Sequence, residues 1–72
     1  MSQYKSGEYL YGFDPVVPEY FLMKEENDDV TPIVGEFTRI RGTKGNLMRE
    51  LKKRNITIPD SHMNLLALDL PF

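Results

Sequence analysis

Seven cationic side chains lie close together between residues 39 and 54, against the single acid Glu50. Several lysines and arginines on one surface can bind a phosphate backbone, because each contact releases condensed counterions. The spacing therefore predicts a candidate nucleic-acid-binding surface. Its members are Arg39, Arg41, Lys44, Arg49, Lys52, Lys53 and Arg54.

The charges of the chain are segregated along the sequence. Residues 1–36 carry eight acids and two lysines, a balance of −6, whereas residues 37–54 carry a balance of +6 and residues 55–72 one of −2. One interpretation is that the two halves face each other within one small fold. Another is that the basic stretch, or the acidic run Glu25–Asp29 acting as a mimic of DNA charge, binds a partner of opposite sign.

The residues that would support enzyme chemistry are missing from the sequence. There is no cysteine, and His62 is the single histidine, so thiolate metal sites and paired-histidine zinc sites have no basis. Glu25–Asp29 lacks the D-x-[DN]-x-[DN]-G spacing of a calcium loop, and Gly42–Gly45 lacks the GxxxxGK[ST] phosphate-binding pattern. We expect no catalytic residues, no metal and no cofactor.

A helix over Lys44–Arg54 must position most of the cations. Its apolar stripe recurs at three- and four-residue spacing and consists of Leu47, Met48 and Leu51. Thr43 or Asn46 can cap the start, and Asn55 suits a left-handed C-terminal cap. Glu50 stands four residues before Arg54, the favourable order for a helical ion pair.

The preceding half of the chain predicts strands. Aromatic and β-branched residues indicate strands over Glu8–Phe13, Glu19–Lys24 and Val30–Arg41, with residues 1–7 as a loose lead and Glu25–Asp29 as an acidic turn. Glu19–Lys24 is apolar on both faces, which is typical of a central strand. The cationic helix would contact residues of the second and third strands, namely Phe21, Met23, Val34, Phe37 or Ile40.

The last part of the chain is short and rich in leucine. Ile56–Ile58 alternates as a fourth strand that ends at Pro59, and Ser61–Leu66 predicts a helical turn followed by extended chain over residues 67–72. The whole chain, 1–72, is then a single α+β domain: a small antiparallel sheet of three to four strands with one main α-helix packed on a face.

The final residues, Asp69-Leu70-Pro71-Phe72, resemble the C-terminal tip of bacterial single-stranded DNA-binding proteins, which ends in acids followed by Ile- or Leu-Pro-Phe. The resemblance implies a docking peptide in which Phe72 enters an apolar pocket on a replication or repair protein. Its carboxylate would meet a basic residue, and Asp69 would add a charge contact. The alternative is that Leu66, Leu68, Leu70 and Phe72 complete the core as a terminal strand.

These observations favour a non-enzymatic small binding protein, an adaptor or inhibitor that docks on a larger macromolecule such as nucleic-acid-processing machinery. The alternatives are direct nucleic-acid binding through residues 39–54, an acidic DNA mimic, and a structural subunit of a homo-oligomer. The profile is typical of small phage or mobile-element proteins. Without cysteine, a signal peptide or a run of about 20 apolar residues, a cytoplasmic location without membrane contact is expected.

Overall fold

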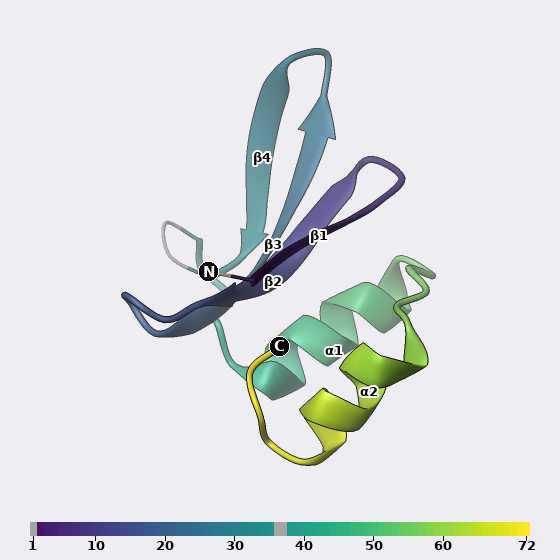
Figure 1. The fold of residues 1–72 in the computed structure, drawn as a ribbon. Coiled ribbons are helices and arrows are strands. Elements are labelled where there is room, and N and C mark those ends of the chain that lie inside the picture. The colour runs from purple at the N-terminus through teal and green to yellow at the C-terminus, as the bar shows by residue number, and fades with distance from the viewer. Residues whose placement is uncertain (1, 36–37) are drawn as a thin grey trace.

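The first half of the chain forms a four-stranded antiparallel sheet (Figure 1). The computed structural model describes residues 2–35 and 38–72. The strands are β1 (Ser2–Ser6), β2 (Tyr9–Asp14), β3 (Glu19–Glu26) and β4 (Asp29–Val34), and their spatial order is β1-β2-β3-β4. Every strand therefore pairs with its neighbour in sequence, an arrangement that short turns allow.

The acidic turn between β3 and β4 is tighter than the sequence predicts. Glu26 pairs with Asp29, so that only Asn27 and Asp28 form the loop. Both have positive φ, 50° and 67°, which is the conformation of the two-residue hairpin turns that asparagine and aspartate favour. The predicted left-handed turn is confirmed, but Glu25 and Glu26 belong to the strand. The hairpin extends away from the helices (Figure 1).

Strand β3 is central, as its apolar sequence predicts. The buried core contains residues of the sheet, both helices and the chain end: Tyr11, Tyr20, Leu22, Val34, Leu47, Leu51, Ile58, Leu66 and Phe72. Phe21 is buried but lies outside this cluster, on the other face of the sheet. The expected contacts of the helix with Phe21 and Met23 were therefore wrong, because a strand that is apolar on both faces does not reveal which face meets the helices.

Two strand boundaries also differ from expectation. Residues 2–6 were expected to be a loose lead, but they pair with β2 in register from Ser2 opposite Phe13 to Ser6 opposite Tyr9. The strand predicted over Val30–Arg41 ends at Val34, where Gly35 has a φ of 108°. Val34 and Ile40 do pack in the core cluster, whereas Phe37 lies outside the described residues.

Two glycines let the chain cross from the sheet to the helices directly over Tyr20. A Cβ on Gly42 would lie 2.4 Å from the Tyr20 carbonyl oxygen, and one on Gly35 would lie 2.8 Å from the same atom. The Tyr20 amide donates to the Gly42 carbonyl at 2.9 Å. Only glycine permits such close approach of two backbone segments.

The predicted cationic helix is confirmed as α1 (Lys44–Lys53). The Thr43 hydroxyl caps its start by accepting from the Asn46 amide at 3.2 Å, and Leu47 and Leu51 are buried beneath it. At its end Asn55 has a φ of 56°. The Asn55 amide donates to the Lys52 carbonyl and the Ile56 amide to the Leu51 carbonyl, which is the Schellman arrangement.

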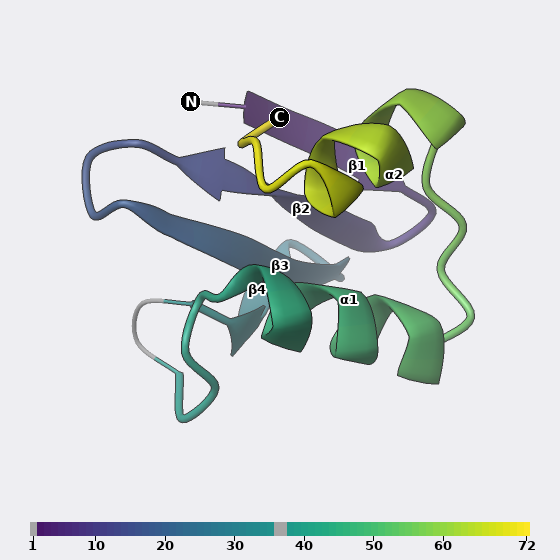
Figure 2. The ribbon, with the colours of Figure 1, turned by 90° about the horizontal axis from the view of Figure 1, so that it is seen from below.

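A second helix, α2 (Asp60–Ala67), replaces the expected single helical turn. It ends on another Schellman pair, with Asp69 at a φ of 60°. Ile56–Ile58 was expected to be a strand, but it links the helices without pairing to the sheet. Both helices cover the same face of the sheet (Figure 2), so the predicted α+β class is confirmed. Neither helix in residues 2–35 and 38–72 is long and apolar enough to cross a membrane.

Candidate functional site: a groove between the helices

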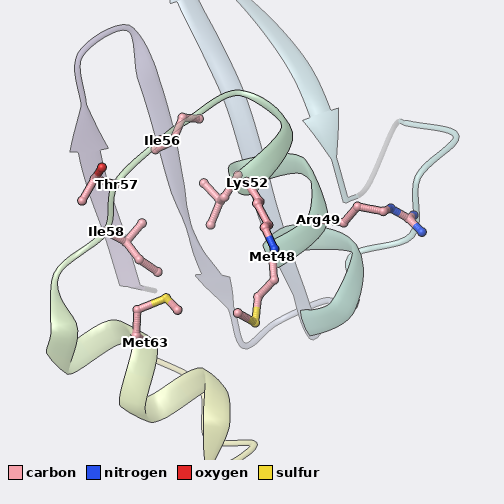
Figure 3. Close-up of a pocket in the computed structure, with 8 residues that line it drawn as sticks. Met48, Arg49, Lys52, Ile56, Thr57, Ile58 and Met63 are labelled. Atoms are coloured by element: carbon pink, nitrogen blue, oxygen red, sulfur yellow. The ribbon is translucent and has the colours of Figure 1, made fainter.

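An apolar groove of about 610 Å³ runs between α1, the link and the first turn of α2. It is lined by Met48, Arg49, Leu51, Lys52, Ile56, Thr57, Ile58 and Met63. The Met48 and Met63 side chains approach it from opposite helices, and Ile58 lies beside Met63 (Figure 3). Met63 is 41% exposed, a large value for an apolar side chain that borders a core. The lining therefore presents apolar surface to solvent.

Local backbone chemistry places these side chains. The Schellman turn at Asn55 reverses the chain, so that Ile56 packs back against the core cluster. Ile58 follows and is buried. Pro59 then starts α2, and its carbonyl accepts from the Met63 amide at 3.1 Å. Met63 consequently faces α1 across the link.

The edge of the groove on α1 is cationic. The Lys52 side chain runs over the groove toward Met48, and the Arg49 guanidinium reaches outward from the helix (Figure 3). Arg49 donates to the Asn46 side chain at 2.6 Å. Lys52 and Lys53 are exposed and have no ion-pair partner within residues 2–35 and 38–72. A segment lying in the groove would therefore meet positive charge along α1.

The one acid of α1 is buried and lies beside two arginines, with its carboxylate 4.0 Å from the Arg49 Nε. Glu50 is buried, with 6% of its surface exposed, and the Arg54 guanidinium donates to its carboxylate at 2.5 Å. This hydrogen bond lowers the pKa of Glu50 below its usual 4.5, although burial opposes the shift. The predicted helical ion pair is confirmed. It holds the last turn of α1 and leaves no exposed carboxylate on this helix.

The remaining predicted cations do not form one continuous surface with Lys52. Lys44 is half-buried and forms an ion pair with Asp69. Arg39 and Arg41 are exposed, but they lie in the irregular connection before α1 and not on the strand that was predicted over Val30–Arg41. The chain bends there because the Thr38 hydroxyl bonds the carbonyls of Gly35 and Ile40.

The end of the chain is packed into the core. Phe72 has 6% of its surface exposed and lies in an aromatic nest formed by Tyr4, Tyr11, Tyr20 and His62. Its ring stacks on His62 at a centroid distance of 5.1 Å. The predicted terminal strand does not form, but Phe72 and Leu66 do complete the core. Phe72 is therefore enclosed by its own chain.

The other residues of the predicted docking tip make contacts within the chain or have exposed side chains. Asp69 pairs with Lys44, and the Leu70 carbonyl accepts from the Tyr20 hydroxyl at 3.2 Å. The Leu70 side chain is half-exposed, and Pro71 is exposed. Docking through Phe72 would require all of these contacts to open.

His62 and the acidic hairpin have structural surroundings. His62 is buried against Tyr4, and its Nδ1 lies 3.4 Å from the Tyr11 hydroxyl. Burial raises the pKa of that hydroxyl. Glu25 pairs with Lys5 at 3.6 Å, and Glu26 pairs with Lys24 at 3.4 Å. Glu25 and Glu26 are thus paired with lysines of the sheet and not with the cations of α1.

The groove is the feature that sequence reasoning missed. Ile56 and Ile58 were predicted to lie in a strand and Met63 in a helical turn, and nothing in their spacing shows that a second helix leaves Met63 beside α1. The available signal was the run Asn55 to Pro59, whose cap and breaker residues mark a tight connection between two helices. Among the residues that the structure describes, no group of three or more acids or histidines is placed to hold a metal.

Comparisons with known proteins add no family to this geometry. No protein-family model, no curated protein and no solved structure matches the chain. The site must therefore be interpreted from its own residues.

Proposed function

We propose that this protein is a non-enzymatic binding protein, an adaptor or inhibitor, that docks on a larger macromolecule through the groove between α1 and α2. The observation that carries the proposal is the exposed apolar lining beside cationic α1. Machinery that processes nucleic acid, in the cytoplasm, is the partner class that the basic stretch favours. Apolar pockets with a few polar groups at the edge are the usual form of recognition sites.

The groove is a better docking surface than the chain end. Recognition requires side chains that a partner can reach, and Met63 is 41% exposed whereas Phe72 is 6% exposed. Phe72 would have to leave the aromatic nest, at a cost of about 3–5 kcal/mol if it resembles other buried phenylalanines. Binding through the groove needs no such opening. We therefore place the docking function at the helices and give Phe72 a structural role.

The test is affinity capture with matched variants. The intact chain, Met63→Glu and Val16→Glu would each be immobilised and exposed to a bacterial lysate. Val16 is 87% exposed in the β2–β3 connection, so its substitution adds the same charge away from the groove. We expect the intact chain and Val16→Glu to capture the same partner and Met63→Glu to lose it, with all three equally folded by circular dichroism. Capture that survives Met63→Glu would contradict the proposal.

Direct nucleic-acid binding is the second candidate, and the observation in its favour is the exposure of five cations, Arg39, Arg41, Arg49, Lys52 and Lys53. It predicts affinity for DNA or RNA that falls steeply with salt and that drops by similar factors when Arg41, Lys52 or Lys53 is changed to glutamine. Absence of binding at low salt, measured by fluorescence anisotropy, would exclude it. Association through the acidic hairpin as a DNA mimic, or between copies of the chain, remains a further proposal.

A further inference from the structure

The lining of the groove is adapted to aliphatic side chains. Met48 and Met63 form its two walls, and Ile56 and Ile58 form the link between them. Thioethers are flexible and polarisable, so methionine walls adjust to side chains of different shape. None of the lining residues is aromatic, although single-stranded nucleic acids are bound largely by stacking on aromatic rings. The lining therefore favours a peptide over a nucleic acid.

The positive charge beside the groove favours a negatively charged peptide. Lys52 lies along the apolar lining (Figure 3), and Arg49 belongs to the lining one turn earlier. Glu50 is buried against Arg54 and also lies 4.0 Å from the Arg49 Nε. Of the two cations in the lining, Lys52 is therefore the one without an ion-pair partner within residues 2–35 and 38–72. On α2 the exposed acid is Asp60, which does not line the groove.

We infer that the groove receives a short segment of another protein in which leucine-like side chains are interspersed with acids. The apolar side chains would lie between Met48 and Met63, and the carboxylates would meet Lys52 and Arg49. This inference rests on the proposed docking function and specifies its partner. Complementary charge would act chiefly on specificity and association rate, while the apolar contacts would hold the complex.

Three synthetic peptides test the inference with fluorescence anisotropy. They share leucines at helical spacing and differ in the residues between them, which are glutamate, glutamine or lysine. At low salt we expect the glutamate peptide to bind about tenfold more tightly than the glutamine peptide, since two or three exposed charge contacts supply that difference. The lysine peptide should bind most weakly.

Charge reversal on α1 supplies the matched variants. Lys52→Glu should weaken the glutamate peptide by roughly fivefold to tenfold and strengthen the lysine peptide, whereas Lys53→Glu, on the same helix but outside the lining, should change either affinity by less than about twofold. Met63→Glu should abolish binding of all three peptides, because a carboxylate then occupies the apolar wall.

The outcomes separate the two levels of the proposal. Equal binding of the glutamate and glutamine peptides, lost in Met63→Glu, would overturn the acidic partner and leave groove docking intact. Absence of binding by every peptide would overturn both. Equal losses of affinity for the glutamate peptide in Lys52→Glu and Lys53→Glu would indicate a diffuse electrostatic attraction. That result would overturn the claim that cations in the groove lining contact the acids of the peptide.

Self-association can be measured by sedimentation at several concentrations. If the chain self-associates and Met63→Glu abolishes this, the occupant of the groove is a second copy of the chain and not a segment of another protein. The segment of that copy with the expected composition is the hairpin, where Val30 lies beside Asp28 and Asp29.

Discussion

The aromatic nest and the groove lie on two sides of α2, and they differ in what covers them. His62 points into the nest, where Phe72 fills the space between it and the tyrosines of the sheet. Met63, the next residue, borders the groove and remains 41% exposed. Two neighbouring positions on one helix thus belong to a closed and an open apolar site.

The difference in exposure distinguishes residues that stabilise the fold from residues that are proposed to bind a partner. A side chain enclosed on every side contributes its full transfer free energy to folding, whereas a half-exposed one leaves part of that free energy for a partner. Phe72 of the same chain fills the nest, whereas the Met63 side of the groove stays exposed at the surface. This is the physical basis for assigning structure to Phe72 and docking to Met63, and the following predictions test that division.

The largest effect is expected from Phe72→Ala. Removing the ring that contacts Tyr4, Tyr11, Tyr20 and His62 should lower the free energy of unfolding by about 3–5 kcal/mol, measured by urea denaturation. Leu68→Ala is the control, because Leu68 is 68% exposed on the same tail and should change stability by less than about 0.5 kcal/mol. If Phe72→Ala leaves the domain stable, the ring is not part of the core. Phe72→Leu, with a smaller loss, keeps the comparison measurable if the alanine variant does not fold.

Two glycine-to-alanine substitutions compare the backbone crossing beside Tyr20 with the first turn of α1. Gly42→Ala should cost about 1–3 kcal/mol, because the new methyl meets the Tyr20 backbone behind the nest. Gly45→Ala has nothing within 4 Å of its Cβ and should stabilise α1 by about 0.5–1 kcal/mol. Thermal unfolding measures both. A harmless Gly42→Ala would show that the crossing segment does not press on Tyr20.

The ion pair behind the groove should respond to acid. The lowered pKa of Glu50 means that its stabilising contribution is present above its usual pKa of 4.5 and is lost as pH falls through the folded value. Arg54→Leu should cost about 1–3 kcal/mol at pH 7, because it leaves a buried carboxylate without its donor. The variant and the intact chain should converge in stability in acid. A constant difference from pH 7 to pH 3, followed by urea denaturation, would contradict this account.

The nest should respond to alkali instead. The raised pKa of Tyr11 means that its contribution is complete below the usual value of 10 and is lost as pH rises through the folded value. Tyr11→Phe should cost about 1 kcal/mol or less at pH 7 and should be less sensitive than the intact chain to pH above 10. Ultraviolet titration of the tyrosinate band measures the shift directly, and a normal titration of Tyr11 would contradict its burial.

The smallest stability effect is expected in the groove. Met63→Ala should lower the free energy of unfolding by less than about 1 kcal/mol, because its side chain is already 41% exposed. The same variant should weaken the acidic peptide by about tenfold, since it removes one apolar wall. A large stability loss in Met63→Ala would place this residue in the core and remove the contrast with Phe72.

The parts of the fold that local physical chemistry determines could be predicted from the sequence. The Thr43 cap, the Leu47 and Leu51 stripe, the Glu50–Arg54 pair and the left-handed Asn55 all depend on residues within one or two helical turns. The central position of β3 followed from its apolar sequence. The predictions for α1 were confirmed because the residues that determine them are close together in the sequence.

The rest depends on contacts between distant residues. Ser2–Ser6 forms a strand because it pairs with β2 and because Tyr4 packs against His62. The polar sequence of this segment does not by itself predict a strand. Either face of β3 could have met the helices. The groove required two predictions at once, that α2 continues beyond one turn and that Phe72 folds back beneath it. Once Phe72 fills the nest, Met63 is left exposed at the border of the groove.

The most direct test of the division between nest and groove is a methyl NMR titration with the glutamate peptide. The methyl groups of Met48 and Met63 should shift, while that of Met23, on the opposite face of the sheet, and the ring signals of Phe72 should stay in place. Shifts centred on Phe72, with the methionine methyls of the groove unchanged, would contradict the account and return the docking role to the tail.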